Sequence, residues 1–207
     1  YNKFIRLSKS NGNCLDSWKE DYKLLIKKAL KNTNKNVYLS KNPPNTGRIR
    51  VLLDMFPNAK FIHIHRNPVE VFASTQKFFY KMLPNLQFQT SDSEKIDDAI
   101  FSLYKNLMDD YFEQKHLIPK ENLFEFSFDQ LQDKPIDALS ELYKELNVSG
   151  FDKAKPNFIV YIENKKHYKK NKHHIKKEHL NRLLVEWDFY MKSFNYTVPN
   201  TIEVDDL

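Results

Sequence analysis

Short apolar runs alternate along the chain with longer segments in which apolar residues recur every three or four positions. Runs of the first kind predict buried strands, and the second spacing predicts amphipathic helices. Asn-, Lys-, Pro- and Gly-containing stretches separate the segments and mark turns. Strands are expected at 37–40, 60–65 and 123–128. The expected helices span 16–31, 49–56, 69–80, 95–116, 136–146 and 178–194.

This alternation of strands and helices predicts an α/β fold, with a parallel β-sheet flanked by helices. The chain has 207 residues, which is enough to bury a full core, and it shows no internal repeat and no linker. We therefore expect one domain over residues 1–207.

The segment after the second predicted strand has the pattern of an anion site. Arg66 ends the strand, Asn67 can cap the next helix, and Pro68 suits its first turn. Glu70 stands where a capping box places a carboxylate, and Ser74 falls on the same helical side. An arginine and a hydroxyl at a helix N-terminus can converge on one phosphate. The alternative is an ordinary capped helix with a surface arginine.

A second pair of cations precedes the helix at 49–56. Lys41 follows the first predicted strand, and Arg48 comes just before the helix. Because the carboxyl ends of parallel strands share one edge of a sheet, we expect Lys41 and Arg66 to face a common crevice. Such spacing suits a ligand with two separated anionic groups, although both Lys41 and Arg48 could equally be solvated.

The amino-acid composition limits which ligands and which kinds of site the chain can have. The formal net charge of +6 favours an acidic partner without choosing among nucleotide, nucleic acid, polysaccharide and membrane surface. Three widely separated glycines cannot form a glycine-rich phosphate loop, and the lone Cys14 excludes an internal disulfide framework. The histidines lack a dependable metal-ligand spacing, so no metal is expected.

The segment 165–177 is a basic run with an embedded aromatic residue, Tyr168. Such a run can close over a nucleotide, can bind nucleic acid, or can be a solvated loop. The residues alone leave these three interpretations open.

Four segments together resemble the sulfotransferases that use 3′-phosphoadenosine-5′-phosphosulfate (PAPS). They occur in the family's order, and the match covers most of residues 37–195. The segments are 39–49, 56–68 with Ser74, 126–135 and 168–171. The resemblance implies a P-loop-NTPase-like sulfotransferase fold, with PAPS as co-substrate, 3′,5′-adenosine bisphosphate (PAP) as product, and no metal.

The resemblance also implies roles for matching positions. Arg66 and Ser74 match the arginine and serine that hold the 3′-phosphate of PAPS. Lys41 matches a lysine near the transferring sulfuryl group and is the expected catalytic residue. Arg48 is an expected cofactor contact. The late loop that covers the nucleotide falls at Tyr168, Lys169 and Lys170.

One part of the family pattern is missing. Members carry a Pro-x-Ser-Gly-Thr-type loop around the 5′-phosphosulfate, and this sequence has no such loop. We therefore expect a sulfotransferase domain that is incomplete at its N-terminus, with no catalytic base assigned. The alternatives are an inactive sulfotransferase-like interaction protein and a basic module that binds nucleic acid or another polyanion through 165–177.

Expectations about partners and location are coarser. The resemblance implies a small-molecule or carbohydrate acceptor bearing a hydroxyl or an amine, and no nucleic acid. No apolar run is long enough to span a bilayer, and the first residues do not resemble a secretory signal, so a cytoplasmic location is expected. The acceptor itself and the oligomeric state cannot be predicted from these residues.

Overall fold

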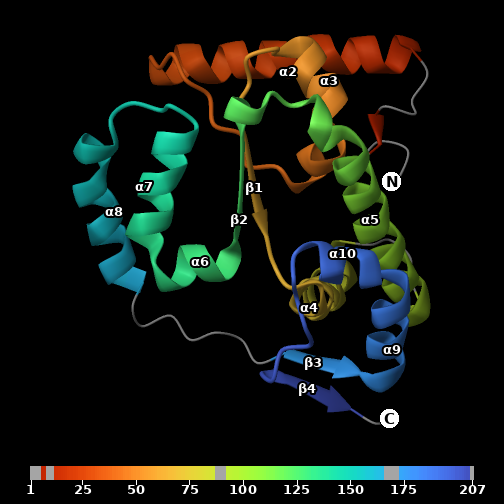
Figure 1. Ribbon diagram of the computed structural model, residues 1–207. Coiled ribbons are helices and arrows are strands. Elements are labelled where there is room, and N and C mark those ends of the chain that lie inside the picture. Colours follow the sequence, from red (N-terminus) through yellow and green to blue (C-terminus); the bar gives the residue numbers. More distant parts are fainter. Residues whose placement is uncertain (1–5, 8–11, 87–91, 166–172, 206–207) are drawn as a thin grey trace. The chain divides into compact units, whose positions relative to one another are not determined.

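The computed structural model describes residues 6–7, 12–86, 92–165 and 173–205 (Figure 1). The chain divides into two compact units. The first comprises residues 1–59 and 106–119, and the second comprises residues 60–105 and 120–207. Within the described residues, no helix combines the length and the apolar character needed to cross a membrane.

The first unit is helical. Its core side chains include Ile49, Leu52 and Tyr111. A buried carboxylate, Asp110, accepts hydrogen bonds from Nε and Nη2 of Arg6, so a charge inside the unit is compensated. The elements of this unit are α2 (Gly12–Thr33), η2 (Pro43–Gly47), α3 (Ile49–Met55), the last part of α5 (Ser93–Gln114) and η3 (Lys115–Leu117).

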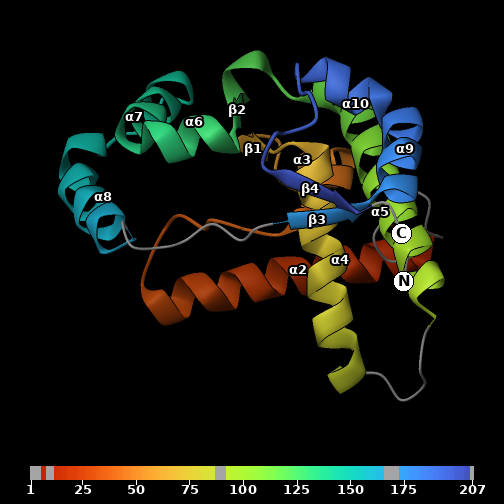
Figure 2. The same cartoon turned by 90° about the horizontal axis from the view of Figure 1, so that it is seen from below.

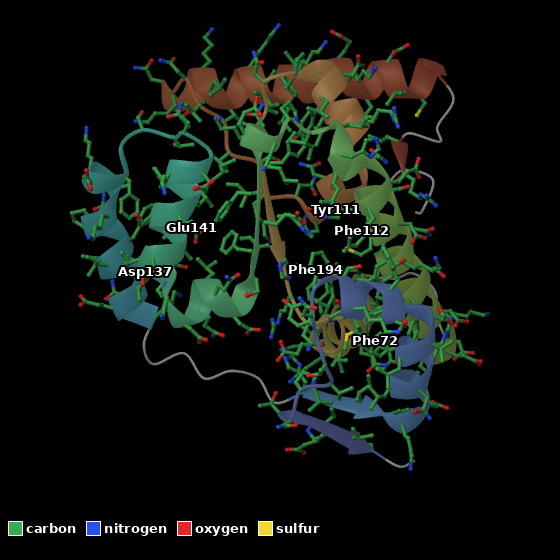
Figure 3. The ribbon with its side chains drawn as sticks, in the orientation of Figure 1. Phe72, Tyr111, Phe112, Asp137, Glu141 and Phe194 are labelled. Carbon is green, nitrogen blue, oxygen red and sulfur yellow. The ribbon has the colours of Figure 1, made fainter. Side chains whose placement is uncertain are left out.

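The second unit carries the strands. Its central core joins Phe72, Phe101 and Trp187, all fully buried, and Phe72 is labelled in Figure 3. A second cluster packs helix α7 against strand β2 around Phe126 and Leu142. The elements are β1 (Phe61–His65), α4 (Pro68–Leu86), the first part of α5, η4 (Lys120–Asn122), β2 (Leu123–Ser127), α6 (Phe128–Asp133), α7 (Pro135–Glu145), α8 (Phe151–Lys165), β3 (His173–Lys176), α9 (Lys177–Glu186), α10 (Asp188–Ser193) and β4 (Ile202–Asp205).

The described strands form two small parallel sheets. Strand β1 pairs with β2, with His65 opposite Ser127 at the carboxyl edge. Strand β3 pairs with β4 in the same sense. Figure 2 shows β3 and β4 crossing helix α4, and β3 packs against that helix. The expected α/β class is thus confirmed only coarsely. The described residues are mostly helical, and two small parallel pairs stand in place of the predicted single parallel sheet.

The predicted strand at 37–40 is wrong. Residues 37–42 form no regular element, and the side chains of Val37 and Leu39 are 83% and 81% exposed. A strand needs a neighbour for its backbone hydrogen bonds, and none of the described strands pairs with this segment. A short apolar run is therefore not sufficient by itself to form a strand here.

The other predicted elements are confirmed with shifted boundaries. Helix α4 continues six residues past the predicted end at 80, and Pro84 lies inside it. The predicted helix at 178–194 is interrupted at Trp187, which ends α9 and begins α10. Helices α6 and α8 and strands β3 and β4 were not predicted.

Candidate functional site

The carboxyl edge of β1 and β2 brings Arg66 next to Phe128. The two parallel strands end together at His65 and Ser127. Arg66 follows β1 directly, and Phe128 follows β2. The guanidinium of Arg66 lies over the Phe128 ring, with Cζ 4.8 Å from the ring centroid. Parallel pairing thus places an arginine on an aromatic surface at this edge.

Helix α4 begins next to this arginine. The Oδ1 atom of Asn67 accepts a hydrogen bond from Val69 N at 3.0 Å, which confirms Asn67 as the cap of the helix. Its Nδ2 donates to the Thr197 carbonyl at 2.7 Å and so ties the C-terminal segment to the same point. Asn67 is 7% exposed, and the cap is therefore an internal feature.

Glu70 does not complete a capping box. Its Oε2 atom instead accepts a hydrogen bond from Arg66 Nε at 2.8 Å, one helical turn away. The Arg66 side chain is 31% exposed and that of Glu70 is 19% exposed. Ser74 lies a further turn along α4 and is half-buried. Glu70 and Ser74 are four residues apart in α4 and so share one side of the helix, as the sequence predicts.

Two aromatic side chains from the C-terminal segment close the other side of the strand end. The Phe194 ring stacks on His65, with the two ring centroids 4.2 Å apart. Phe194 is labelled in Figure 3. The Tyr196 hydroxyl lies 2.8 Å from His65 Nδ1. Burial raises the pKa of Tyr196 to about 12, with Asp129 and Glu70 adding to the rise and Arg66 opposing it. The Tyr196 hydroxyl is therefore a neutral partner of His65.

The predicted residues before α3 lie in the first unit. Lys41 is exposed and follows an irregular segment, which corrects the expectation that it ends a strand. Arg48 is only 8% exposed, and its Cζ lies 5.2 Å from the Trp18 ring centroid. Burial lowers the pKa of Arg48. Tyr168, Lys169 and Lys170 lie outside the described residues.

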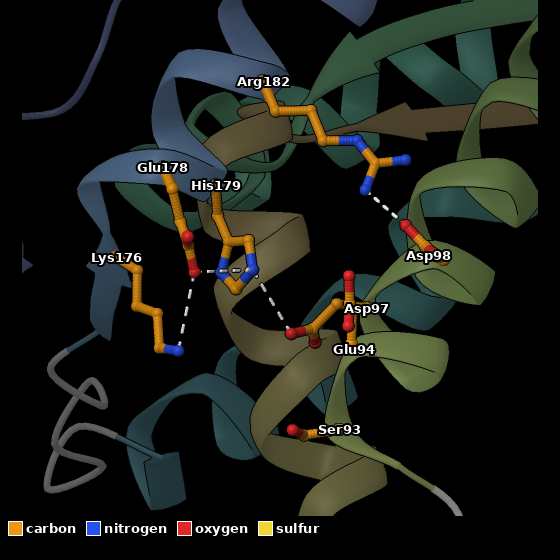
Figure 4. A pocket seen from close by; sticks show the side chains of 8 residues that line it. All are labelled: Ser93, Glu94, Asp97, Asp98, Lys176, Glu178, His179 and Arg182. Atoms are coloured by element: carbon orange, nitrogen blue, oxygen red, sulfur yellow. Dashed lines mark hydrogen bonds and ion pairs between the residues drawn. The ribbon is translucent and has the colours of Figure 1, made fainter. Parts of the chain in front are cut away.

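A separate cavity of about 440 Å³ lies between the starts of α5 and α9 (Figure 4). The buried carboxylate of Asp97 accepts hydrogen bonds from Tyr80 and Gln76, and it lies 3.3 Å from His179 Nε2. Glu94, Asp98 and Glu178 also line this cavity. Because its carboxylates outnumber its cations, this cavity is unsuited to an anion.

The sequence did not indicate the contacts of Arg66. The spacing predicts Glu70 as a capping residue, whereas the structure pairs it with Arg66. Phe128 comes from a segment 62 residues away, and the pairing of β1 with β2 brings it to Arg66. Tyr196 lies 130 residues away and contacts the neighbouring His65. The family resemblance gave one indication of these contacts, because Phe128 lies inside the matched segment 126–135.

The sequence model of the sulfotransferase family matches residues 8–153. The omega-hydroxy-beta-dihydromenaquinone-9 sulfotransferases Stf3 of Mycobacterium bovis and Mycobacterium tuberculosis are each 29% identical over 199 residues. That match covers 95% of this chain and 50% of each relative, so the chain spans about half the length of the curated relatives it matches.

The crystal structure of the sulfotransferase STF9 from Mycobacterium avium is similar with a TM-score of 0.61 at 16% identity. The similarity covers 76% of this chain and 41% of that structure, and it shows a shared fold. The resemblance predicted from the four sequence segments is thus confirmed at the level of the family. Since the family model covers well over half of the residues, the chain belongs to the sulfotransferase family.

Proposed function

We propose that this protein transfers a sulfuryl group from PAPS to an acceptor. Membership of the sulfotransferase family supports the reaction class. The observation that carries the assignment is the fixed, partly exposed arginine at the carboxyl edge of β1. An anion site at that edge, next to a helix N-terminus, suits a ligand with a phosphate group.

Arg66 is proposed to hold the 3′-phosphate. Its Nε is occupied by Glu70 and its plane rests on Phe128, so the orientation of the guanidinium is set before a ligand arrives. The donors on the two Nη atoms would contact the phosphate, and a preset orientation lowers the entropy cost of binding. Ser74 would add a hydroxyl donor from the next turn of α4.

Lys41 is proposed as the catalytic cation. PAPS supplies the sulfuryl group and a nucleotide leaving group. The exposed ammonium of Lys41 would stabilise the negative charge that develops on the leaving oxygen. Arg48 is proposed to support the same region. Its buried position against Trp18 suits it to holding the turn Pro43–Gly47 that follows Lys41.

The names of the relatives support a hydroxyl as the acceptor group. The names of the two Stf3 proteins describe a hydroxylated menaquinone derivative. We propose a hydroxyl-bearing acceptor for this chain as well, without assigning the molecule that carries it.

The test is calorimetric titration of the full-length protein with PAP. Arg66→Ala should weaken PAP binding by about tenfold or more, because a charge-assisted hydrogen-bonded contact contributes roughly 1.5–3 kcal/mol. Arg182→Ala is the matched control. Arg182 lies on α9 of the same unit, paired with Asp98 and Glu186, and its loss should leave PAP affinity unchanged.

Absence of PAP binding would overturn the proposal, as would PAP binding that Arg66→Ala leaves intact. If the protein instead binds nucleic acid with an affinity that falls steeply with salt concentration and is unchanged in Arg66→Ala, a basic binding module would be favoured. PAP binding without conversion of PAPS to PAP in the presence of hydroxylated acceptors would favour an inactive family member.

A further inference from the structure

A cavity of about 520 Å³ is lined by residues of helix α4 and strand β3. Figure 2 shows how this strand crosses the helix. Lys77 and Lys81 line it from the helix, and His173 and His174 line it from the strand. Among the described residues that line the cavity there is no carboxylate. Its chemistry is therefore opposite to that of the acidic cavity at α5 and α9, and it favours an anion.

His173 is the unusual member of this set. Side chains alternate along β3, so His173 is buried at 9% exposure while His174 is exposed. The Nδ1 atom of His173 is buried and has no hydrogen-bond partner among the described residues. A buried ring nitrogen without a partner is uncommon in a folded protein and points to a missing ligand or proton.

The charges that face His173 come mainly from α4 and its start. Burial lowers the pKa of His173, and Arg66, Lys77 and His174 lower it further, while Glu70 opposes them. The imidazole is therefore neutral at pH 7 in the free protein.

The remaining charged and polar groups near the cavity come from β4 and from α4. Glu203 and Asp205 of β4 lie 3.5 and 3.7 Å from His174 Nδ1. The Tyr80 hydroxyl donates to Asp97, and Lys81 lines the cavity about one turn of α4 after Lys77. The electrostatic balance at His173 is thus set by an excess of cations.

We propose that this cavity is a phosphate subsite in which His173 takes up a proton from solvent when a phosphate group enters, so that ligand binding beside Arg66 depends on pH. The part of this inference that identifies the ligand as PAP rests on the proposed function. Arg66 and Lys77 both act electrostatically on His173, which links the cavity to the proposed phosphate site at Arg66. Lys77 also follows Ser74 by about one turn of α4.

The direction of the pH dependence follows from linkage. A bound dianion stabilises the imidazolium form and raises the pKa of His173 in the complex. Between the pKa of the free protein and that of the complex, affinity should fall about tenfold per pH unit as pH rises. Below the lower of these two values His173 is already protonated, and this dependence disappears.

The first measurement is an NMR titration of the His173 ring in the full-length protein, assigned by its loss in His173→Gln. Sodium sulfate is a useful probe, because it stays doubly charged where a phosphomonoester with a pKa near 6 changes its own charge. We expect millimolar sulfate and micromolar PAP each to raise the midpoint of His173 by about one pH unit, a tenfold coupling. 5′-AMP, which lacks the 3′-phosphate, should match PAP only at much higher concentration.

Variants locate the effect. Lys77→Gln should reduce the sulfate-induced shift at least severalfold, whereas Lys144→Gln should not, because Lys144 is 83% exposed on α7. His173→Gln should flatten the pH dependence of PAP affinity relative to the unmodified protein. Because His173 is buried, His173→Gln could also disturb the fold. Lys77→Gln is the second variant, because Lys77 is exposed and its replacement should leave the fold intact.

The outcomes separate the two proposals. Arg66-dependent PAP binding with an unshifted His173 midpoint would overturn the subsite and leave the proposed function standing. A sulfate-induced shift without PAP binding would support the subsite and overturn the proposed function. If neither anion shifts His173 and PAP does not bind, both are wrong.

Discussion

At the scale of single residues, the candidate site depends on side chains that orient one another. Arg66 is held by Glu70 and Phe128, and His65 is held by Phe194 and Tyr196. Each contact is modest alone, but together they present one guanidinium with a defined orientation at the end of β1. Preset geometry of this kind is what an anion site needs, because ordering the side chain then costs little on binding.

Tyr196→Phe tests this arrangement. The phenyl ring should keep its packing on His65, while the loss of the 2.8 Å contact leaves His65 Nδ1 without that partner. We expect the free energy of unfolding to fall by about 1 kcal/mol, measured by urea denaturation. Tyr161→Phe is the matched control, since Tyr161 is 65% exposed on α8 and its hydroxyl should contribute little. Equal losses in both variants would contradict the argument.

At the scale of elements, the start of α6 shows how a local signal supports the site. Ser127 ends β2 and caps α6, accepting a hydrogen bond from Gln130 N, while the Gln130 side chain accepts one from Ser127 N. This capping box turns the chain sharply after β2 and places Phe128 beneath Arg66. A short helix thus positions the aromatic surface of the site.

Ser127→Ala should therefore affect both stability and the site. Loss of the cap should lower the free energy of unfolding by about 1 kcal/mol, measured by thermal or urea unfolding. PAP affinity should fall as well, because Phe128 loses its fixed place. Ser140→Ala, on the exposed side of α7, is the control and should change neither quantity. An unchanged stability in Ser127→Ala would show that the cap does not matter here.

At the scale of the whole molecule, three partly desolvated tyrosines couple the stability of the fold to alkaline pH. Burial is the largest cause of the raised pKa of Tyr80, Tyr104 and Tyr196, with values of about 12 for Tyr80 and Tyr196. Their pKa in the unfolded chain is about 10. Above that pH the unfolded state releases protons that the folded state retains, so ionisation favours unfolding.

We therefore expect stability to be unaffected by these groups below about pH 10 and to fall progressively as the pH rises from about 10 towards 12. Urea unfolding followed by circular dichroism at pH 9, 10 and 11 measures the slope. Tyr196→Phe should make the decline shallower than in the unmodified protein, whereas Tyr161→Phe should not. A Tyr196→Phe variant with the full original slope would show that Tyr196 does not contribute.

Much of the helical structure and the start of α4 could be predicted from the sequence, because these features depend on neighbours within a few residues. The cap at Asn67 and the shared helical side of Glu70 and Ser74 follow from local spacing. Strands β3 and β4 escaped prediction because they are short and pair across 29 residues, from His173 to Ile202. The break at Trp187 also escaped, because a fully buried tryptophan joins two helices whose patterns run together.

The sequence by itself determined the family and the order of the motifs around Arg66, since both are linear patterns. Only the tertiary structure decided which partners surround that arginine, that residues 37–40 form no strand, and that His173 is buried in a basic cavity. The physical reason is the same in each case. Burial, strand pairing and the electrostatic surroundings of a side chain depend on residues far away in the chain, and a linear pattern carries little information about them.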